Sequence, residues 1–433
     1  MYPLLLFLLL SLPLPTLTQH PGTYEPEHHP PLPIQSCTPS TCTPLSTSLV
    51  LDADWRWLHS TNSTTNCYDW GSWNKTLCPN GRTCASNCAL EGATYDRVYG
   101  VKTEAGKGNL SMAYVTRFDY SQNVGSRVFV VDEGEGEGQG QGEKYVMWRL
   151  LNREVVFEVD ANVEDWVPNP LPEVFVGKGR YGSCCPEVAL WNANSVSASL
   201  SAHPCRIDRQ TRCEGLNCED WLCDRVGCDL NSYRLGDREF YGAGKKVDTT
   251  RKFTVITQFI TDTNTDTGTL VEIRRKYIQD GVVLEDSKSS VPSIPKTSGI
   301  GDSYCRKQKA AFAERDVFAE KGGMAQIGKV LAQGMVLAFA ITEDQEGHML
   351  WLDSNWPVDA DPNAPGVARG ACANDTGDPA NVMWEASRAK VSYADIRVGW
   401  IGMSEAAVKE IFDWTGLEAA RLQRPIKYPN RYS

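Results

Sequence analysis

The stretch Lys252–Gln279, which reads KFTVITQFITDTNTDTGTLVEIRRKYIQ, decides the fold class. Two runs rich in β-branched and aromatic residues, Lys252–Ile260 and Leu270–Gln279, flank a polar segment, a pattern typical of neighbouring strands. Asn152-Arg153 and Asp280-Gly281 are turn candidates beside such runs. Similar runs between Val50 and Asp286 are Leu110–Arg117, Arg127–Val131, Lys144–Leu151 and Val155–Val159. Many strands with few helices predict an all-β sandwich.

The two ends of the chain differ from this central part. Residues 1–18 form a short apolar run that ends in small residues, which indicates a secretory signal peptide cleaved near Gln19. Residues 19–34 are expected to form a loose Pro/His-rich leader, and residues 35–402 the sandwich domain. Residues 307–333 are partly helical in pattern, and Ala389–Ile401 reads as a closing strand. Residues 403–433 are expected to form a helical extension, because Val408, Ile411, Phe412 and Leu417 recur at helical spacing.

Charge and composition narrow the function. The formal net charge of −11 argues against nucleic-acid binding and gives no attraction to anionic membranes. No stretch after the signal peptide is long and apolar enough to cross a bilayer. Four glycosylation sequons, at Asn62, Asn74, Asn109 and Asn374, fit a secreted, extracellular protein. Glu133–Glu143, EGEGEGQGQGE, predicts a flexible loop between two strands.

Fifteen cysteines in a secreted chain predict disulfides, with at least one thiol left over. Zinc is the competing interpretation for the regularly spaced Cys213, Cys218, Cys223 and Cys228. Their gaps are wider than those of a zinc knuckle, so we favour disulfides. No metal and no organic cofactor is expected.

Seven ordered segments carry a family resemblance. They are Leu51–Trp57 (LDADWRW), Thr61–Tyr68 (TNSTTNCY), Tyr181–Cys205 (YGSCCPEVALWNANSVSASLSAHPC), Gly227–Gly236 (GCDLNSYRLG), Phe240–Phe259 (FYGAGKKVDTTRKFTVITQF), His348–Ser354 (HMLWLDS) and Pro365–Cys372 (PGVARGAC). Together they resemble glycoside hydrolase family 7, the fungal-type cellulases, across roughly residues 35–402. The resemblance implies a two-sheet jelly-roll (concanavalin A-like) sandwich with long loops and a substrate cleft. It also implies retaining hydrolysis of cellulose or another β-1,4-glucan by a monomer.

The family's catalytic residues follow the pattern Glu-x-Asp-x-x-Glu on one strand. Retention needs a carboxylate nucleophile and a carboxylic acid about 5–5.5 Å apart. Because side chains alternate along a strand, the second Glu reaches the same face only if the strand bulges. Here Glu187 matches the nucleophile, Ala189 replaces the Asp, and Asn192 replaces the acid/base Glu. An amide cannot protonate a leaving group, and the loss of a general acid costs about 10²–10⁴-fold in rate.

The resemblance also assigns substrate-binding positions. Trp55 and Trp57 match the family's paired stacking Trp, and strand spacing would place both on one face, although a core pair is the alternative. Trp351 matches a Trp near the cleavage point, and Thr342 lies where the family has another Trp. The remaining matches have either cleft or structural roles, and they are His203, Arg234 and Arg369.

The family's cysteine pairing, carried over to this chain, accounts for twelve cysteines. The implied pairs are Cys37–Cys42, Cys67–Cys88, Cys78–Cys84, Cys205–Cys223, Cys213–Cys218 and Cys228–Cys305. The family partners of Cys184, Cys185 and Cys372 would lie in a block that the family has between Val159-Asp160 and the segment matched by Ala161–Trp166. That block is absent here, through either an incomplete gene model or a natural deletion.

Three functions follow as expectations. The first is a cellobiohydrolase-like β-1,4-glucanase with severely reduced activity, favoured by the Trp pair and the Pro365–Gly370 loop. The second is a catalytically inactive glucan-binding homologue. The third is a secreted structural protein with no affinity for sugars.

Overall fold

The computed structural model describes residues 19–69, 72–104, 106–119, 121–133, 144–160, 181–215, 218 and 221–405. The chain divides into two compact units. Unit 1 comprises Met1–His28 and Ala53–Thr94, and unit 2 comprises His29–Asp52 and Tyr95–Ser433. In the ranges given above, no helix has the length and hydropathy needed to span a membrane. The expected signal peptide lies outside the described residues.

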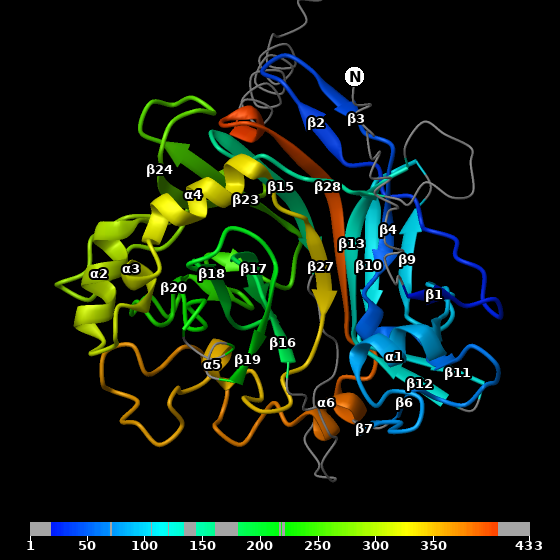
Figure 1. Cartoon of the computed structure of the whole chain (residues 1–433). Coiled ribbons are helices and arrows are strands. Elements are labelled where there is room, and N and C mark those ends of the chain that lie inside the picture. Colours follow the sequence, from blue (N-terminus) through cyan, green and yellow to red (C-terminus); the bar gives the residue numbers. More distant parts are fainter. Residues whose placement is uncertain are drawn as a thin grey trace, which may run out of the picture. The chain divides into compact units, whose positions relative to one another are not determined.

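Unit 2 is built on a ten-stranded sheet (Figure 1). Its main path is β25 (Val282–Glu285), β24 (Leu270–Gln279), β23 (Phe253–Thr261), β15 (Arg153–Asp160), β28 (Lys390–Trp400), β10 (Asn109–Ala113) and β9 (Val101–Glu104), with β2 (Gln35–Cys37), β3 (Cys42–Pro44) and β26 (Gly299–Ile300) beside it. The two runs that decided the fold class are β23 and β24, which pair antiparallel. The predicted closing strand is β28, which pairs with β15 and β10 in the middle of the sheet.

Two smaller sheets pack against the ten-stranded sheet. One contains β14 (Lys144–Tyr145), β13 (Ser126–Asp132), β27 (Ala338–Ile341) and β4 (Thr47–Leu51), and the other β17 (Glu187–Ala193), β18 (Ala198–His203) and β20 (Cys228–Asn231). Trp191 of β17 contacts Phe157 and Phe253 of the large sheet, at ring-centroid distances of 6.2 Å each. Phe339 of β27 lies 5.0 Å from Tyr393 of β28. These aromatic contacts form a core between two layers, so the predicted β-sandwich is confirmed.

Shorter pairs complete the strands of unit 2. They are β11 (Val115–Phe118) with β12 (Ser121–Val124), β16 (Tyr181–Cys184) with β19 (Thr211–Glu214), and β21 (Tyr241–Gly242) with β22 (Val247–Asp248). Leu110–Arg117 therefore supplies two strands, β10 and β11, and not one.

The predicted turns occur where expected. Asn152, Asp280 and Gly281 have φ values of 54°, 51° and 73°, so each lies in the left-handed region that Asn, Asp and Gly tolerate best. Asp280-Gly281 joins β24 to β25.

The predicted strand Lys144–Leu151 is wrong beyond its first two residues. One edge of β13 pairs with β4 over Val128–Asp132. On its other edge, β27 pairs with Ser126–Phe129, so only Val131 and Asp132 remain for β14. The rest of the segment makes an isolated bridge at Trp148.

Helices lie between the strands of unit 2. They are α2 (Asp302–Ala311), α3 (Val317–Glu320), α4 (Gly323–Gln333), α5 (Leu350–Asp353) and α6 (Pro379–Glu385). The first three confirm the helical pattern expected for residues 307–333, and α4 lies over β24 (Figure 1). The expected terminal helix and the Gly-rich loop lie largely outside the described residues.

Unit 1 is small and rich in cysteine. It contains a three-stranded sheet of β1 (His20–Pro21), β8 (Cys88–Leu90) and β5 (Leu58–Ser60), a hairpin of β6 (Tyr68–Asp69) and β7 (Ser72–Trp73), the 3-10 helix η1 (Ala53–Trp55) and α1 (Gly81–Asn87). The disulfides Cys67–Cys88 and Cys78–Cys84 form its centre.

The leader at residues 19–34 is not loose. His20 and Pro21 pair with β8 inside unit 1, while Leu32 and Ile34 are fully buried in unit 2. The Pro/His-rich composition concealed these two apolar side chains, whose burial is worth about 1.5–3 kcal/mol each.

Six disulfides are present, and they join the same pairs that the family resemblance implies. The four cysteines considered as a zinc set are all in disulfides. Cys184, Cys185 and Cys372 take part in none of these six disulfides.

Candidate active-site face

The strand that carries the candidate catalytic residues bulges in the middle. Glu187 pairs with His203 and Ala189 with Ser201, but Asn192 pairs with Ser199. Three steps along β17 therefore match two along β18, which is the geometry of a bulge. The extra residue corrects the parity, so Glu187, Ala189 and Asn192 share one face, as the sequence pattern required.

This face continues across the sheet to β20. Ser201 also pairs with Asp229, and Ser199 with Asn231. Directly paired residues of antiparallel strands lie on the same side of the sheet. The face therefore has three rows of side chains, which begin at Glu187, Ala189 and Asn192. Glu187 is exposed, Asn192 is half-buried, and Ala189 is buried. This face of the three strands therefore carries two carboxylates, Glu187 on β17 and Asp229 on β20.

His203 is oriented by two contacts. Its Nδ1 donates to the carbonyl oxygen of Asp224 at 3.0 Å, because a carbonyl can only accept. Its Nε2 lies 2.9 Å from the Ser201 hydroxyl. Both ring nitrogens are therefore engaged within the protein, which fixes the ring beside Ser201.

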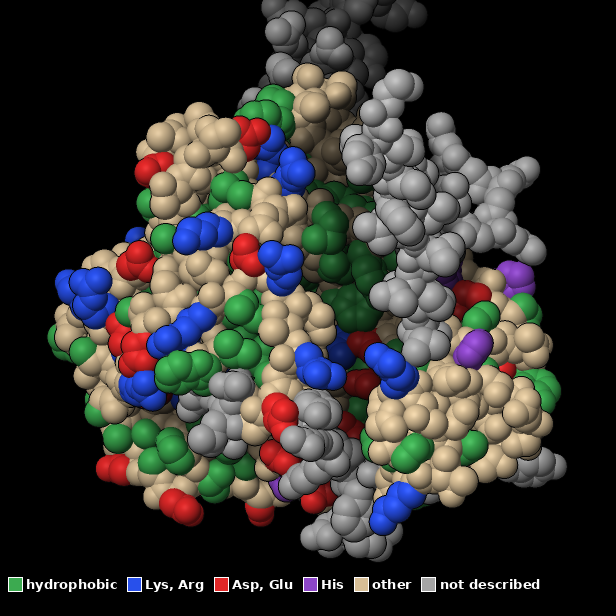
Figure 2. Space-filling view, in the orientation of Figure 1, with side chains coloured by type: hydrophobic (Ala, Val, Ile, Leu, Met, Phe, Trp, Pro, Cys, Tyr) green, Lys and Arg blue, Asp and Glu red, His purple; other side chains and the backbone are tan. Residues whose placement is uncertain are grey.

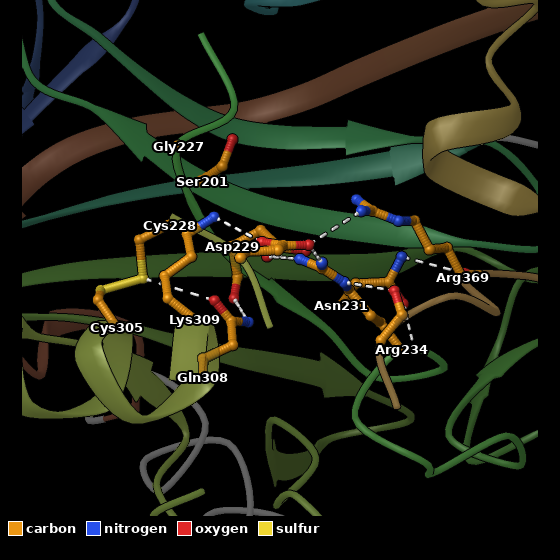
Figure 3. A network of polar contacts seen from close by, with 12 residues as sticks. Ser201, Gly227, Cys228, Asp229, Asn231, Arg234, Cys305, Gln308, Lys309 and Arg369 are labelled. Atoms are coloured by element: carbon orange, nitrogen blue, oxygen red, sulfur yellow. Dashed lines mark hydrogen bonds and ion pairs between the residues drawn. A yellow bond between two sulfur atoms is a disulfide. The ribbon is translucent and has the colours of Figure 1, made fainter. Parts of the chain in front are cut away.

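A buried ion cluster surrounds Asp229 (Figure 3). The Arg234 guanidinium donates to Asp229 and Glu314, and its Nε donates to the carbonyl of Gly366 at 3.0 Å. It also lies 4.5 Å above the ring of Phe312. Burial alone would raise the pKa of Asp229, but the neighbouring cations outweigh it and hold that pKa below its ordinary value. Asp229 is therefore ionised and cannot serve as the missing acid.

Two more cations reach the same cluster. Lys309 of α2 donates to Glu314 at 2.9 Å, and the Arg369 guanidinium lies 3.6 Å from Glu314. Figure 3 shows Arg234, Lys309 and Arg369 extending toward this region from different elements. Burial and the charge of Arg234 lower the pKa of Arg369 to about 10. Its buried Nε has no hydrogen-bond acceptor in the described part of the chain.

The backbone of Trp351 contacts one cation of this cluster, Arg369. The Arg369 Nη1 is 3.4 Å from the Trp351 carbonyl oxygen. The indole N–H of Trp351 donates to Asp344 Oδ2 at 2.9 Å, which fixes the ring while leaving it half-exposed. Thr342 is exposed and offers no aromatic ring. His203, Arg234, Trp351 and Arg369 thus all belong to unit 2 with the Glu187 face.

Trp55 and Trp57 belong to unit 1, and the strand geometry predicted for them is wrong. Trp55 ends the 3-10 helix η1, because the Arg56 N–H bonds back to the carbonyl of Ala53. Trp57 precedes β5 and is 37% exposed, so the two are not a core pair either. The Trp57 indole N–H donates to Asn66 Oδ1 at 2.8 Å.

Sequence reasoning missed several members of the site. Ser201 and Asp229 could have been found from strand parity once the partners of β18 were known. Lys309 and Glu314 carry no local signal, because only the tertiary packing of α2 brings them to β20. Figure 2 shows charges of both signs interspersed over α2, α3 and α4, and a hollow beside β27 with hydrophobic side chains at its bottom.

The chain is similar to proteins of one known family. The family model for glycosyl hydrolase family 7 matches residues 21–163 and 160–404. A crystal structure of a family 7 cellobiohydrolase from Daphnia pulex is 36% identical, with a TM-score of 0.82 over 89% of this chain and 99% of that one. A cellobiohydrolase from Melanocarpus albomyces complexed with cellotetraose is 32% identical, with a TM-score of 0.78 over 89% and 99%.

An endocellulase from Humicola insolens is 29% identical, with a TM-score of 0.73 over 89% of this chain and 100% of that one. The similarity thus extends to both cellobiohydrolases and endocellulases. Since the matched segments span nearly the whole described sandwich, the chain belongs to glycosyl hydrolase family 7.

Proposed function

We propose that this protein is a secreted, cellobiohydrolase-like β-1,4-glucan protein whose hydrolytic activity is severely reduced. The observation that carries the proposal is the face of β17. Its bulge brings positions 187, 189 and 192 to one side, but only Glu187 has a carboxylate there. The scaffold for retaining catalysis is therefore kept, while two of its three carboxyl positions are lost.

The chain retains the nucleophile position, Glu187, but not the general acid, because Asn192 occupies that position. Glu187 is exposed and can attack an anomeric carbon, which would form a glycosyl ester. The leaving sugar oxygen then needs a proton that Asn192 cannot supply. Asp229, the other carboxyl group on this face, is kept ionised by its neighbouring cations and has no proton to give. Departure of an unprotonated sugar alkoxide is slow, and activation of water for the second step is also impaired.

The features that support glucan binding are separate from this defect. Trp351 presents a half-exposed indole ring that its N–H bond to Asp344 fixes in place. A fixed aromatic ring is a suitable surface for the apolar face of a sugar. A relative of known structure binds cellotetraose. The catalytically inactive glucan-binding homologue is therefore the second candidate function.

We infer that a block of strands is missing beside the catalytic strand. The two matched stretches of the family model meet at residues 160–163, just where β15 ends. Among the described strands, β17 pairs with β18 alone, so its other edge has no partner there. The three cysteines outside the six disulfides point to the same absent block, because their family partners would lie in it. Sequencing the transcript across codons 155–170 distinguishes a natural deletion from an incomplete gene model, since the transcript encodes the missing strands only in the second case.

Two substrates test the proposal. Cello-oligosaccharides need an acid for cleavage, whereas an aryl cellobioside with an activated leaving group does not. We expect no hydrolysis of cellohexaose above background, and slow release of the aryl group that Glu187→Gln abolishes. Turnover of cellohexaose by the unmodified chain would refute the severe defect. Measurable cellohexaose binding without turnover of either substrate favours the binding homologue, and absence of binding refutes both.

A further inference from the structure

Unit 1 contains a shallow pocket at the β6–β7 hairpin. Its volume is about 390 Å³, within the range of small-molecule sites. The lining residues are Thr64, Thr65, Asn66, Asp69, Ser72, Trp73 and Asn74. Nearly all of them offer hydroxyl, amide or carboxylate groups, and one offers an aromatic ring. This mixture is suited to a pyranose, which has polar edges and apolar faces.

Trp73 supplies the aromatic surface of the pocket. Its side chain is 49% exposed, and its ring centroid lies 4.8 Å from that of Tyr68, which is 36% exposed. Tyr68 and Trp73 pair directly across the hairpin, so each fixes the other's position. The two rings together form an exposed aromatic surface at the hairpin.

Asn74 follows Trp73 and begins the sequon Asn74-Lys75-Thr76. Its Oδ1 accepts from the backbone N–H of Thr76 at 3.0 Å and of Leu77 at 3.2 Å. The backbone N–H of Asn74 donates to the carbonyl of Cys67 at 2.9 Å, beside the Cys67–Cys88 disulfide. The side chain is thereby oriented through its oxygen, and Nδ2, the atom that a glycan modifies, has no acceptor within the described residues.

The other three sequons lack this combination. The side chain of Asn109 hydrogen-bonds to Glu104. The Nδ2 of Asn374 donates to the carbonyl of Val358 at 3.2 Å. Asn62 is exposed, but it does not line the pocket. Asn74 alone, of these four, places an oriented amide beside an exposed indole ring.

We propose that Asn74 carries an N-linked glycan whose first pyranose packs on Trp73 inside this pocket. The glycan comes from a lipid-linked oligosaccharyl diphosphate. The Nδ2 atom bonds to the sugar C1, the C1–O bond to the diphosphate breaks, and the amide loses one proton. The inference rests on the secretion that belongs to the proposed function. A covalently attached sugar has a high effective concentration at the pocket, which favours it over a free glucan chain.

The experiment uses the full chain secreted from a eukaryotic host. Thr76→Ser keeps the sequon and Thr76→Ala destroys it, while both keep Asn74 and its turn. Each is made with Trp73 intact and with Trp73→Ala, and the thermal midpoints of the four proteins form a double-mutant cycle. Peptide mass mapping measures the occupancy of Asn74. Trp384→Ala, which removes a similarly exposed Trp from unit 2, is the matched control.

We expect a glycan on Asn74 and a midpoint about 2 °C lower for Thr76→Ala than for Thr76→Ser. This difference should vanish with Trp73→Ala and persist with Trp384→Ala. An unmodified Asn74 in protein recovered from the medium would overturn the inference while leaving secretion intact. A midpoint difference that survives Trp73→Ala would overturn the packing. A chain that stays in the cytoplasm without a glycan would overturn both the inference and secretion.

Discussion

At the scale of single residues, three positions of β17 matter most. The bulge between Ala189 and Asn192 is present although two of the three carboxylates that it would align are gone. The family resemblance and strand parity together predicted this bulge. They could not predict that Asp229 would be held by Arg234, because that ion pair follows from tertiary contacts.

Trp351 gives a prediction at the same scale. The Asp344 carboxylate fixes the indole through its N–H, so the ring is preorganised for stacking. Trp351→Ala should weaken cellohexaose binding at least tenfold, since an aromatic contact of this size is worth about 1.5–3 kcal/mol. Isothermal titration measures the dissociation constant. Equal affinity in the wild type and Trp351→Ala, with Trp384→Ala as the control, would exclude Trp351 from the site.

At the scale of elements, the sequence predicted strands with strong apolar patterns better than short segments. β23, β24 and β28 were found because long β-rich runs leave little ambiguity. The segment Lys144–Leu151 failed because a strand has only two edges, and those of β13 were already largely occupied. Trp55 and Trp57 failed because η1 interrupts the extended backbone that their spacing assumed.

An ion pair in unit 1 gives a prediction for one element. The Glu91 carboxylate accepts the backbone N–H groups of Thr23–Glu25 at 3.1, 3.0 and 2.8 Å, and His59 Nε2 lies 2.6 Å from it. The His59 Nδ1 faces the carbonyls of Ser60 and Ser63 at 2.8 and 3.0 Å, so both ring nitrogens point at acceptors. This arrangement needs an imidazolium.

The pH dependence of this pair follows from its two pKa shifts. Burial alone would lower the pKa of His59, but its bonds to Glu91 and the two carbonyls raise it. The same pairing and the backbone N–H groups lower the pKa of Glu91 against the opposite effect of burial. The His59 contribution is present below about pH 6.5 and is lost as pH rises through the raised pKa. The Glu91 contribution is lost only as pH falls through the lowered pKa.

Amide hydrogen exchange tests this clamp. Correcting for intrinsic exchange, the protection of Thr23–Glu25 should be highest around pH 5–6 and should fall toward alkaline pH. Glu91→Gln should lower the protection and remove its pH dependence. Protection that stays constant up to pH 9 would show that His59 is not the group that titrates.

At the scale of the whole molecule, the sandwich and its disulfides were predictable, because ordered motifs and cysteine pairs extend along the chain. The division into two units and the burial of Leu32 and Ile34 were not, since both depend on contacts between distant segments. If the block that we infer beside β17 is missing, the family partners of Cys184, Cys185 and Cys372 are missing with it.

The inferred loss of this block predicts the number of thiols in the protein. Six disulfides and three thiols account for all fifteen cysteines. Thiol titration of the denatured, unreduced protein should give three per chain. A value of one would mean that two of Cys184, Cys185 and Cys372 have paired, against the structure.

Asp286 gives a prediction about global stability. Burial raises its pKa to about 7, although Arg275 and the Ser287 N–H act in the opposite direction. A raised carboxyl pKa means that the folded protein holds a proton that the unfolded chain releases. Its contribution is therefore present below about pH 4 and is lost as pH rises through 7.

Thermal unfolding between pH 4 and pH 8 measures this effect. Asp286→Asn should lose less stability than the wild type over that interval, because the amide does not titrate. Asp266→Asn, at an exposed carboxyl group of unit 2, is the control and should follow the wild type. Parallel curves for Asp286→Asn and the wild type would contradict the assignment.

The rate of cellohexaose hydrolysis by Asn192→Glu with Ala189→Asp shows whether the two lost carboxylates limit the activity of this chain. The bulge already aligns these positions with Glu187, so the double variant should regain hydrolysis by at least about 10²-fold over the wild type. The matched control is the same double variant with Glu187→Gln, which should remain inactive. A wild type that hydrolyses cellohexaose as fast as the double variant would contradict the account.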